Sequence, residues 1–117
     1  MRSSSTDSAL RDILRHVLLA QEFVAGMDAK SFHDDARTVL AVIRCLEVIS
    51  EASRRLPQEV KARHPSIAWR QIAGAGNIYR HNYEDVTADI VWDTVARDLP
   101  TLREAVEQEL SKTPNRG

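Results

Sequence analysis

The stretch ARTVLAVIRCLEVISEASRRL, residues 36–56, decides the fold of this chain. Its apolar residues recur at spacings of three and four, the period of one face of an α-helix. They are Ala36, Val39, Leu40, Ile43, Leu46 and Ile49. Ser31 lies upstream with Asp34 three positions later, a pairing typical of a capping box at a helix N-terminus. The pattern predicts a long amphipathic helix that begins near Ser31 and runs to about Leu56.

The same spacing occurs on the N-terminal side of this stretch. Apolar residues mark one helix face, namely Leu10, Ile13, Leu14, Val17, Leu18 and Val24. Asp7 or Ser8 can cap its start, and Gly26 is a suitable end point. A first helix is therefore expected before the long one.

On the C-terminal side, PQEVKARHP (residues 57–65) predicts a short connection of about one helical turn, and a third helix is expected from Ala68. A fourth helical pattern starts near Thr87 and continues across Pro100, where we expect a kink, or a new helix capped by Asp98. The apolar residues of this last pattern are Val91, Val95, Leu99, Leu102, Val106 and Leu110.

Together these segments predict an all-α fold, an antiparallel bundle of four to five helices. No segment shows the period-2 alternation of a strand. We expect a single helical domain over residues 7–111, with flexible tails at residues 1–6 and 112–117.

Composition limits the possible functions. The 117 residues include 16 basic and 17 acidic side chains, so a net charge of −1 provides no global field for non-specific nucleic-acid binding. Cys45 is the single cysteine, which excludes a disulfide framework within the chain and a multi-thiolate metal site. No apolar run reaches signal-peptide or membrane-spanning length, so a cytoplasmic protein is expected.

The stretch GNIYRHNYEDV, residues 76–86, carries the strongest candidate chemistry. His81 is suited to proton transfer near neutral pH, and Asn77, four residues earlier on the same helix face, can orient its ring. The alternatives remain open. His81 can instead interact with the last carbonyls of a helix, and Tyr83 can be a packing residue.

Other residues give weaker signals. His33 with Asp34 and Asp35 has metal-ligand types at unfavourable consecutive positions, and His16 and His64 are expected to be exposed or packing residues. The small residues of GAG, 74–76, suggest the close approach of another helix or an interface, because no strand or lysine completes a phosphate loop.

Taken together, several stretches give the chain a close resemblance to one family. They are LEVISEA (46–52), HPSIAWRQIAGAGN (64–77), the H-x-Y of His81 and Tyr83, and IVWDTVARDLPTL (90–102). In this order and spacing they resemble the HepT-like toxin family of the HEPN superfamily, over about residues 8–110.

The resemblance implies a symmetric homodimer with metal-independent endoribonuclease activity on RNA and no cofactor. It also implies a small nucleotidyltransferase antitoxin as partner, which can attach AMP to the motif tyrosine. Carried over to this sequence, His81 is the acid/base residue, Tyr83 the candidate for AMP modification, and Asn77 and Tyr83 the residues that orient or bind RNA. No membrane or DNA partner is implied.

One departure from the family motif concerns a charge. In the motif, four to six residues separate an arginine from the histidine, and at the corresponding positions this chain has Gly74, Ala75 and Gly76. We expect Arg80 to supply the missing positive charge, or else Arg70 of a second subunit. The alternative is a catalytically inactive HEPN module that binds a nucleotidyltransferase partner.

Overall fold

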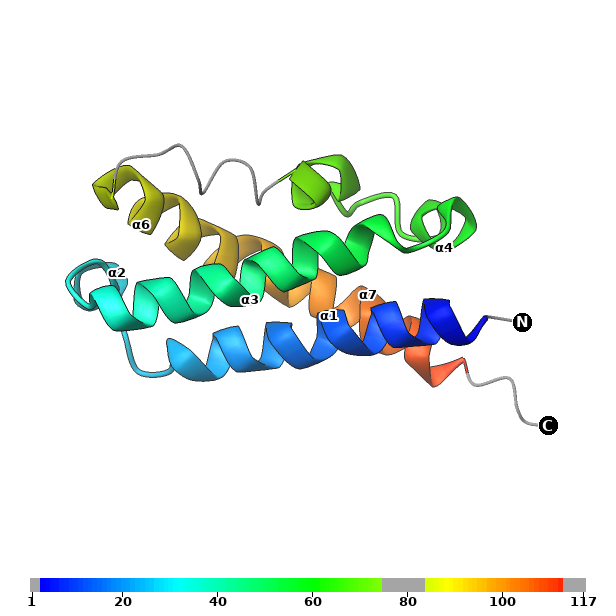
Figure 1. The fold of residues 1–117 in the computed structure, drawn as a ribbon, viewed down its shortest axis with the longest axis horizontal. Helices are drawn as coiled ribbons and strands as arrows, with labels where there is room; N and C mark the ends of the chain where they lie inside the picture. The colour runs from blue at the N-terminus through cyan, green and yellow to red at the C-terminus, as the bar shows by residue number, and fades with distance from the viewer. Residues whose placement is uncertain (1–2, 75–83, 113–117) are drawn as a thin grey trace.

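The described residues of the computed structural model are 3–74 and 84–112, with side chains described from Thr87 onward in the second range. Throughout these residues the regular structure is helical (Figure 1), which confirms the all-α prediction. In chain order, the elements are α1 (Ser4–Phe23), α2 (Ala29–His33), α3 (Ala36–Arg54), α4 (Gln58–Ala62), a helical stretch at residues 69–74, α6 (Glu84–Asp93), a π-helical turn η1 (Thr94–Asp98) and α7 (Leu99–Ser111).

The bundle is built around α1. Helix α1 runs antiparallel to α3 and packs against both α3 and α7, and the start of α1 and the end of α7 lie at the same end of the molecule (Figure 1). Each long helix contributes one apolar stripe to the core, and the stripes include Leu10, Ile13, Val17, Val42, Leu46, Ile49, Val91, Leu99, Leu102 and Val106. No helix in the described residues is long and apolar enough to cross a membrane.

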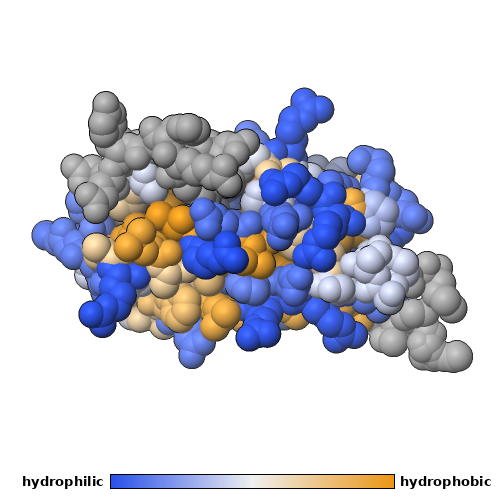
Figure 2. Space-filling view, in the orientation of Figure 1, coloured by the Kyte–Doolittle hydropathy of each residue, from blue (hydrophilic) through white to orange (hydrophobic). Residues whose placement is uncertain are grey.

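The buried face of α3 is rotated slightly from the predicted one. Val42 is fully buried, whereas Leu40 is 66% exposed. Leu18 on α1 is also partly exposed, although it was expected in the core. Figure 2 shows apolar residues gathered at the surface over α3 and the adjoining part of α1. Leu40 and Leu18 therefore belong to the surface of the chain.

Two predicted helix starts were wrong, and local hydrogen bonds explain both. The hydroxyl of Ser3 accepts a hydrogen bond from the backbone N–H of Thr6, so α1 begins at Ser4 and includes residues assigned above to a flexible tail. The predicted long helix is two helices. Asp28 and Ser31 form a reciprocal capping box on α2, and the carboxylate of Asp35 then accepts the N–H of Thr38 to start α3.

Pro100 does not break the last helix. Residues Thr94–Asp98 widen into a π-helical turn, in which the N–H of Leu99 donates to the carbonyl of Thr94, five residues earlier. A proline ring in a regular α-helix crowds the carbonyl four residues before it, and a wider turn relieves that crowding. Asp98 has helical backbone angles and makes no capping bond, so the predicted new helix capped by Asp98 was wrong.

A buried carboxylate links α7 to the chain that follows α4. Glu109 is 1% exposed, and Arg63 donates to both of its oxygens at 3.0 and 2.9 Å. His64 Nε2 lies 2.7 Å from the same carboxylate, so His64 belongs to a polar cluster where the sequence predicted an exposed or packing residue. The hydrogen bonds from Arg63 outweigh the effect of burial and lower the pKa of Glu109 from 4.5 to about 2.

Candidate functional site

The predicted site residues Asn77, Arg80, His81 and Tyr83 lie outside the described residues, so their roles stay predictions. The structure describes the two ends to which their segment is joined. One end is Gly74, the last described residue of a helical stretch that begins at residue 69. The other is Glu84, the first residue of α6. The described neighbourhood of the motif is therefore the surface around these two ends.

The Gly74 end is fixed to α3 through a backbone carbonyl. The buried hydroxyl of Ser50 donates to the carbonyl of Ala73 at 2.8 Å, and the guanidinium of Arg54 donates to the same oxygen. Arg54 also donates to the Ser50 hydroxyl at 3.1 Å. These hydrogen bonds tie the described end of residues 69–74 to α3. The chain thus enters the motif segment from a fixed point.

The start of the same helical stretch is fixed as well. The indole N–H of Trp69 donates to the carbonyls of Lys61 and His64, at 3.2 and 3.1 Å. These carbonyls lie at the end of α4 and in the connection that follows it. Because both ends of residues 69–74 are held, Gln71 and Ile72 between them have defined positions.

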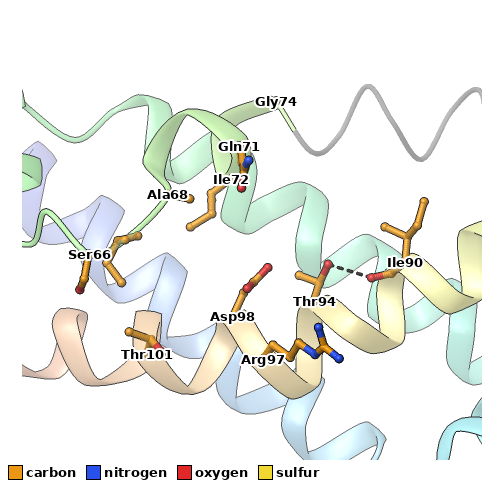
Figure 3. A pocket seen from close by; sticks show the side chains of 11 residues that line it. Ser66, Ala68, Gln71, Ile72, Gly74, Ile90, Thr94, Arg97, Asp98 and Thr101 are labelled. Atoms are coloured by element: carbon orange, nitrogen blue, oxygen red, sulfur yellow. Dashed lines mark hydrogen bonds between the residues drawn. The ribbon is translucent and has the colours of Figure 1, made fainter.

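A groove with a volume of about 440 Å³ lies between residues 66–74 and the helix that runs through η1 (Figure 3). We call it the Arg97 groove. Its described lining residues are Ser66, Ile67, Ala68, Gln71, Ile72, Gly74, Ile90, Thr94, Arg97, Asp98 and Thr101. Gly74 is among them, so the groove reaches the point where the motif segment begins.

The polar wall of the groove comes mainly from the π-helical turn. Thr94 and Asp98 are four residues apart and so lie on one side of the helix, which Ile90 and Thr101 continue, while Arg97 lines the groove from the position next to Asp98. The Thr94 hydroxyl donates to the carbonyl of Ile90 at 2.9 Å (Figure 3). Among the described residues, neither Arg97 nor Asp98 has a side-chain hydrogen bond or ion-pair partner, so both are available to a ligand.

Two other residues considered for the site have different surroundings. Arg70 lines a separate groove of about 500 Å³ with Lys61, Pro65 and Trp69, so within one subunit it does not share the Arg97 groove. A Cβ added at Gly74 would meet nothing within 4 Å. Gly74 is therefore not required by a close helix within the described part of this chain.

The acidic residues near His33 have structural roles. Asp34 pairs with Lys30 at 2.9 Å, and Asp35 caps α3. Within residues 3–74 and 84–112, no group of three or more His, Cys, Asp or Glu side chains is placed to hold a metal ion. Cys45 is buried in the core, and burial raises the pKa of its thiol.

Residues 10–109 match the profile of a family described as Ribonuclease HepT-like. The chain belongs to this HepT-like family. It is 37% identical over 99 residues to the "Probable ribonuclease HepT" of Thermococcus cleftensis, covering 85% of this chain and 90% of that protein. It is 34% identical over 106 residues to the "Putative RNase TTE0752" of Caldanaerobacter subterraneus subsp. tengcongensis, covering 87% of this chain and 95% of that protein.

No solved structure gives a significant match to this HepT-like chain. The family match extends from α1 into α7 and includes the motif segment, the Arg97 groove and the Glu109 cluster. The family predicted from the sequence is thus confirmed.

Sequence reasoning missed the polar residues of the Arg97 groove. It treated Asp98 only as a helix cap and gave no role to Arg97. The available signal was the polar row Thr94, Arg97, Asp98 and Thr101, which lies apart from the apolar stripe of the same helix.

Proposed function

We propose that this HepT-like protein is a metal-independent endoribonuclease and the toxin of a toxin–antitoxin pair. The observation that carries the proposal is the family match over residues 10–109, which includes the His81-x-Tyr83 motif. In this proposal the active form is a homodimer in the cytoplasm. Its partner is a small nucleotidyltransferase, which silences the toxin by attaching AMP to Tyr83.

The proposed reaction needs proton transfer and charge stabilisation. His81 accepts the proton of a ribose 2′-hydroxyl, the 2′-oxygen forms a bond to the adjacent phosphorus, and the bond from phosphorus to the 5′-oxygen breaks. The same histidine of the second subunit can return a proton to the leaving 5′-oxygen. Arg80 stabilises the charge that develops on the phosphate, while Asn77 and Tyr83 orient the groups. The products are a 2′,3′-cyclic phosphate and a 5′-hydroxyl.

The direct test is cleavage of end-labelled RNA by protein purified without any partner, in the presence of EDTA. We expect cutting at internal positions, with 2′,3′-cyclic phosphate and 5′-hydroxyl ends identified by mass spectrometry. Complete loss of cutting in EDTA that returns with a divalent metal would contradict the proposed mechanism. Absence of cutting under all conditions, over a panel of RNAs, would contradict ribonuclease activity itself.

Arg80 is expected to take the place of the motif arginine. An Arg80→Ala variant should cut RNA about 100- to 1,000-fold more slowly, the usual effect of removing one donor that stabilises transition-state charge. Gly76→Arg in that background should restore part of the rate. The rates are compared in the same end-labelled RNA assay, with Arg44→Ala as a matched control because Arg44 is an exposed arginine on α3. An unchanged rate in Arg80→Ala would show that Arg80 is not the substitute cation.

The absence of an arginine at positions 74–76 favours a second candidate function. In this alternative the protein is a catalytically inactive HEPN module that binds its nucleotidyltransferase partner. It predicts a stable complex with the partner together with no RNA cutting by the free protein. The same assay, combined with co-purification of the two proteins, separates the two functions.

A further inference from the structure

The Arg97 groove combines the chemical features that a single nucleotide requires. It has apolar side chains from both walls, a cation, a carboxylate and a side-chain amide, contributed by Ile72, Ile90, Arg97, Asp98 and Gln71. Its volume of about 440 Å³ is within the range of about 300–1,000 Å³ found for small-molecule sites. A nucleotide presents an apolar base face, a polar base edge and a phosphate, which correspond to these three kinds of group.

Charge determines which part of a nucleotide lies at each side chain. The Arg97 guanidinium is a fork of donors suited to a phosphate, and it has no acidic partner among the described residues. The Asp98 carboxylate repels phosphate and accepts hydrogen bonds, so it suits the amino group of a base. In Figure 3, Asp98 points toward the helix of Gln71 and Ile72, whereas Arg97 is turned away from it.

The π-helical turn explains why these side chains are presented together. Thr94, Arg97 and Asp98 all line the groove from this turn, with Asp98 directed toward residues 66–74 and Arg97 turned away from them (Figure 3). Single π-helical turns often occur at functional sites. The hydrogen bonds to Ala73 and from Trp69 hold the opposite wall. Both walls of the groove are therefore fixed before a ligand arrives, which favours binding.

We propose that the Arg97 groove binds one nucleotide of single-stranded RNA beside the cleaved bond. Arg97 contacts its phosphate, and Asp98 accepts a hydrogen bond from the exocyclic amino group of its base, with the base packed between Ile72 and Ile90. The choice of RNA as ligand rests on the proposed ribonuclease activity. The groove ends at Gly74, where the motif segment begins, so a strand lying in the groove leads toward that segment.

The test is binding of fluorescein-labelled oligo(C) and oligo(U) RNA, measured by fluorescence anisotropy at several salt concentrations. All proteins carry His81→Ala so that cutting does not interfere. Arg97→Gln should weaken binding about tenfold and reduce the salt slope by about one phosphate contact. The parent should bind oligo(C) more tightly than oligo(U), because cytosine has an amino group where uracil has a carbonyl oxygen. Asp98→Ala should remove that preference.

Arg11→Gln is the matched control, since it removes the same charge from a separate groove between α1 and α7. Equal weakening by Arg11→Gln and Arg97→Gln, or no RNA binding by the parent at 50 μM protein, would overturn the proposal. Circular dichroism melting checks that the variants are folded. RNA binding that depends on Arg97, combined with no cutting by wild type, would retain the groove proposal and reject the ribonuclease. RNA cutting by wild type, combined with RNA binding that does not depend on Arg97, would retain the ribonuclease and reject the groove proposal.

Discussion

Replacing His81 by alanine is expected to slow RNA cutting at least 100-fold. A positioned general base or acid typically contributes a factor of about 100 to 10,000, because the 2′-hydroxyl is a weak nucleophile until its proton is accepted. In a symmetric dimer the variant loses both the acceptor and the residue that returns a proton. The initial rate of cutting is measured on end-labelled RNA, with wild type at equal concentration.

His16→Ala is the matched control for this experiment. The His16 ring nitrogen Nδ1 lies 2.8 Å from the backbone carbonyl oxygen of Asp12, one turn earlier on α1. The variant therefore removes a histidine whose hydrogen bond lies within α1. Cutting should be unchanged in this control. Equal rates in wild type and His81→Ala would mean that another residue, or a contaminating nuclease, performs the reaction.

Replacing Glu109 by glutamine is expected to lower the free energy of unfolding at pH 7 by about 3 kcal/mol. The shift of its pKa from 4.5 to about 2 corresponds to an energy of that size, because each unit of pKa is about 1.4 kcal/mol. The amide also presents a donor where Arg63 and His64 require acceptors. Urea unfolding followed by circular dichroism gives the difference between the two proteins.

The same contribution should depend on pH in a defined direction. The pKa of Glu109 is lower in the folded chain than in the unfolded chain, so its stabilisation is complete above about pH 4.5 and is lost as the pH falls toward 2. The difference between wild type and Glu109→Gln should therefore shrink over that window. Glu107→Gln is the matched control, because Glu107 lies on the same helix at the surface and forms an exposed pair with Arg103. Its effect should stay below about 1 kcal/mol, as for other surface pairs. Equal effects of the two substitutions would contradict the role of the buried cluster.

The sequence was sufficient to predict the helices but not their exact faces and ends. Apolar spacing identified α1, α3 and α7, because each has a single buried stripe. Spacing alone did not show that Val42 is buried and Leu40 exposed, because each lies three or four positions from other apolar residues of α3. Ser31 and Asp28 are both good caps, and only the folded backbone shows that Asp28 starts the helix and Ser31 completes the box.

Contacts between distant parts of the chain could not be read from spacing. His64 and Glu109 are 45 residues apart, so nothing local indicates that they share a buried cluster. The Arg97 groove likewise joins residues 66–74 to residues 90–101. The motif with His81 and Tyr83 was recognisable because its residues are close in sequence, whereas its groove became visible only with the fold.

The π-helical turn also has a consequence for changes in chain length. Its carbonyl-to-amide bonds span one residue more than those of an α-helix, so the segment Thr94–Asp98 holds one surplus residue within an unbroken helix. Deleting a single residue there would yield a regular α-helix and leave the buried faces on either side of the turn in register. Val91 and Leu102 would then both stay in the core. A one-residue deletion should therefore be tolerated better here than in a regular part of α7, where it would rotate one side of the helix against the other by about 100°.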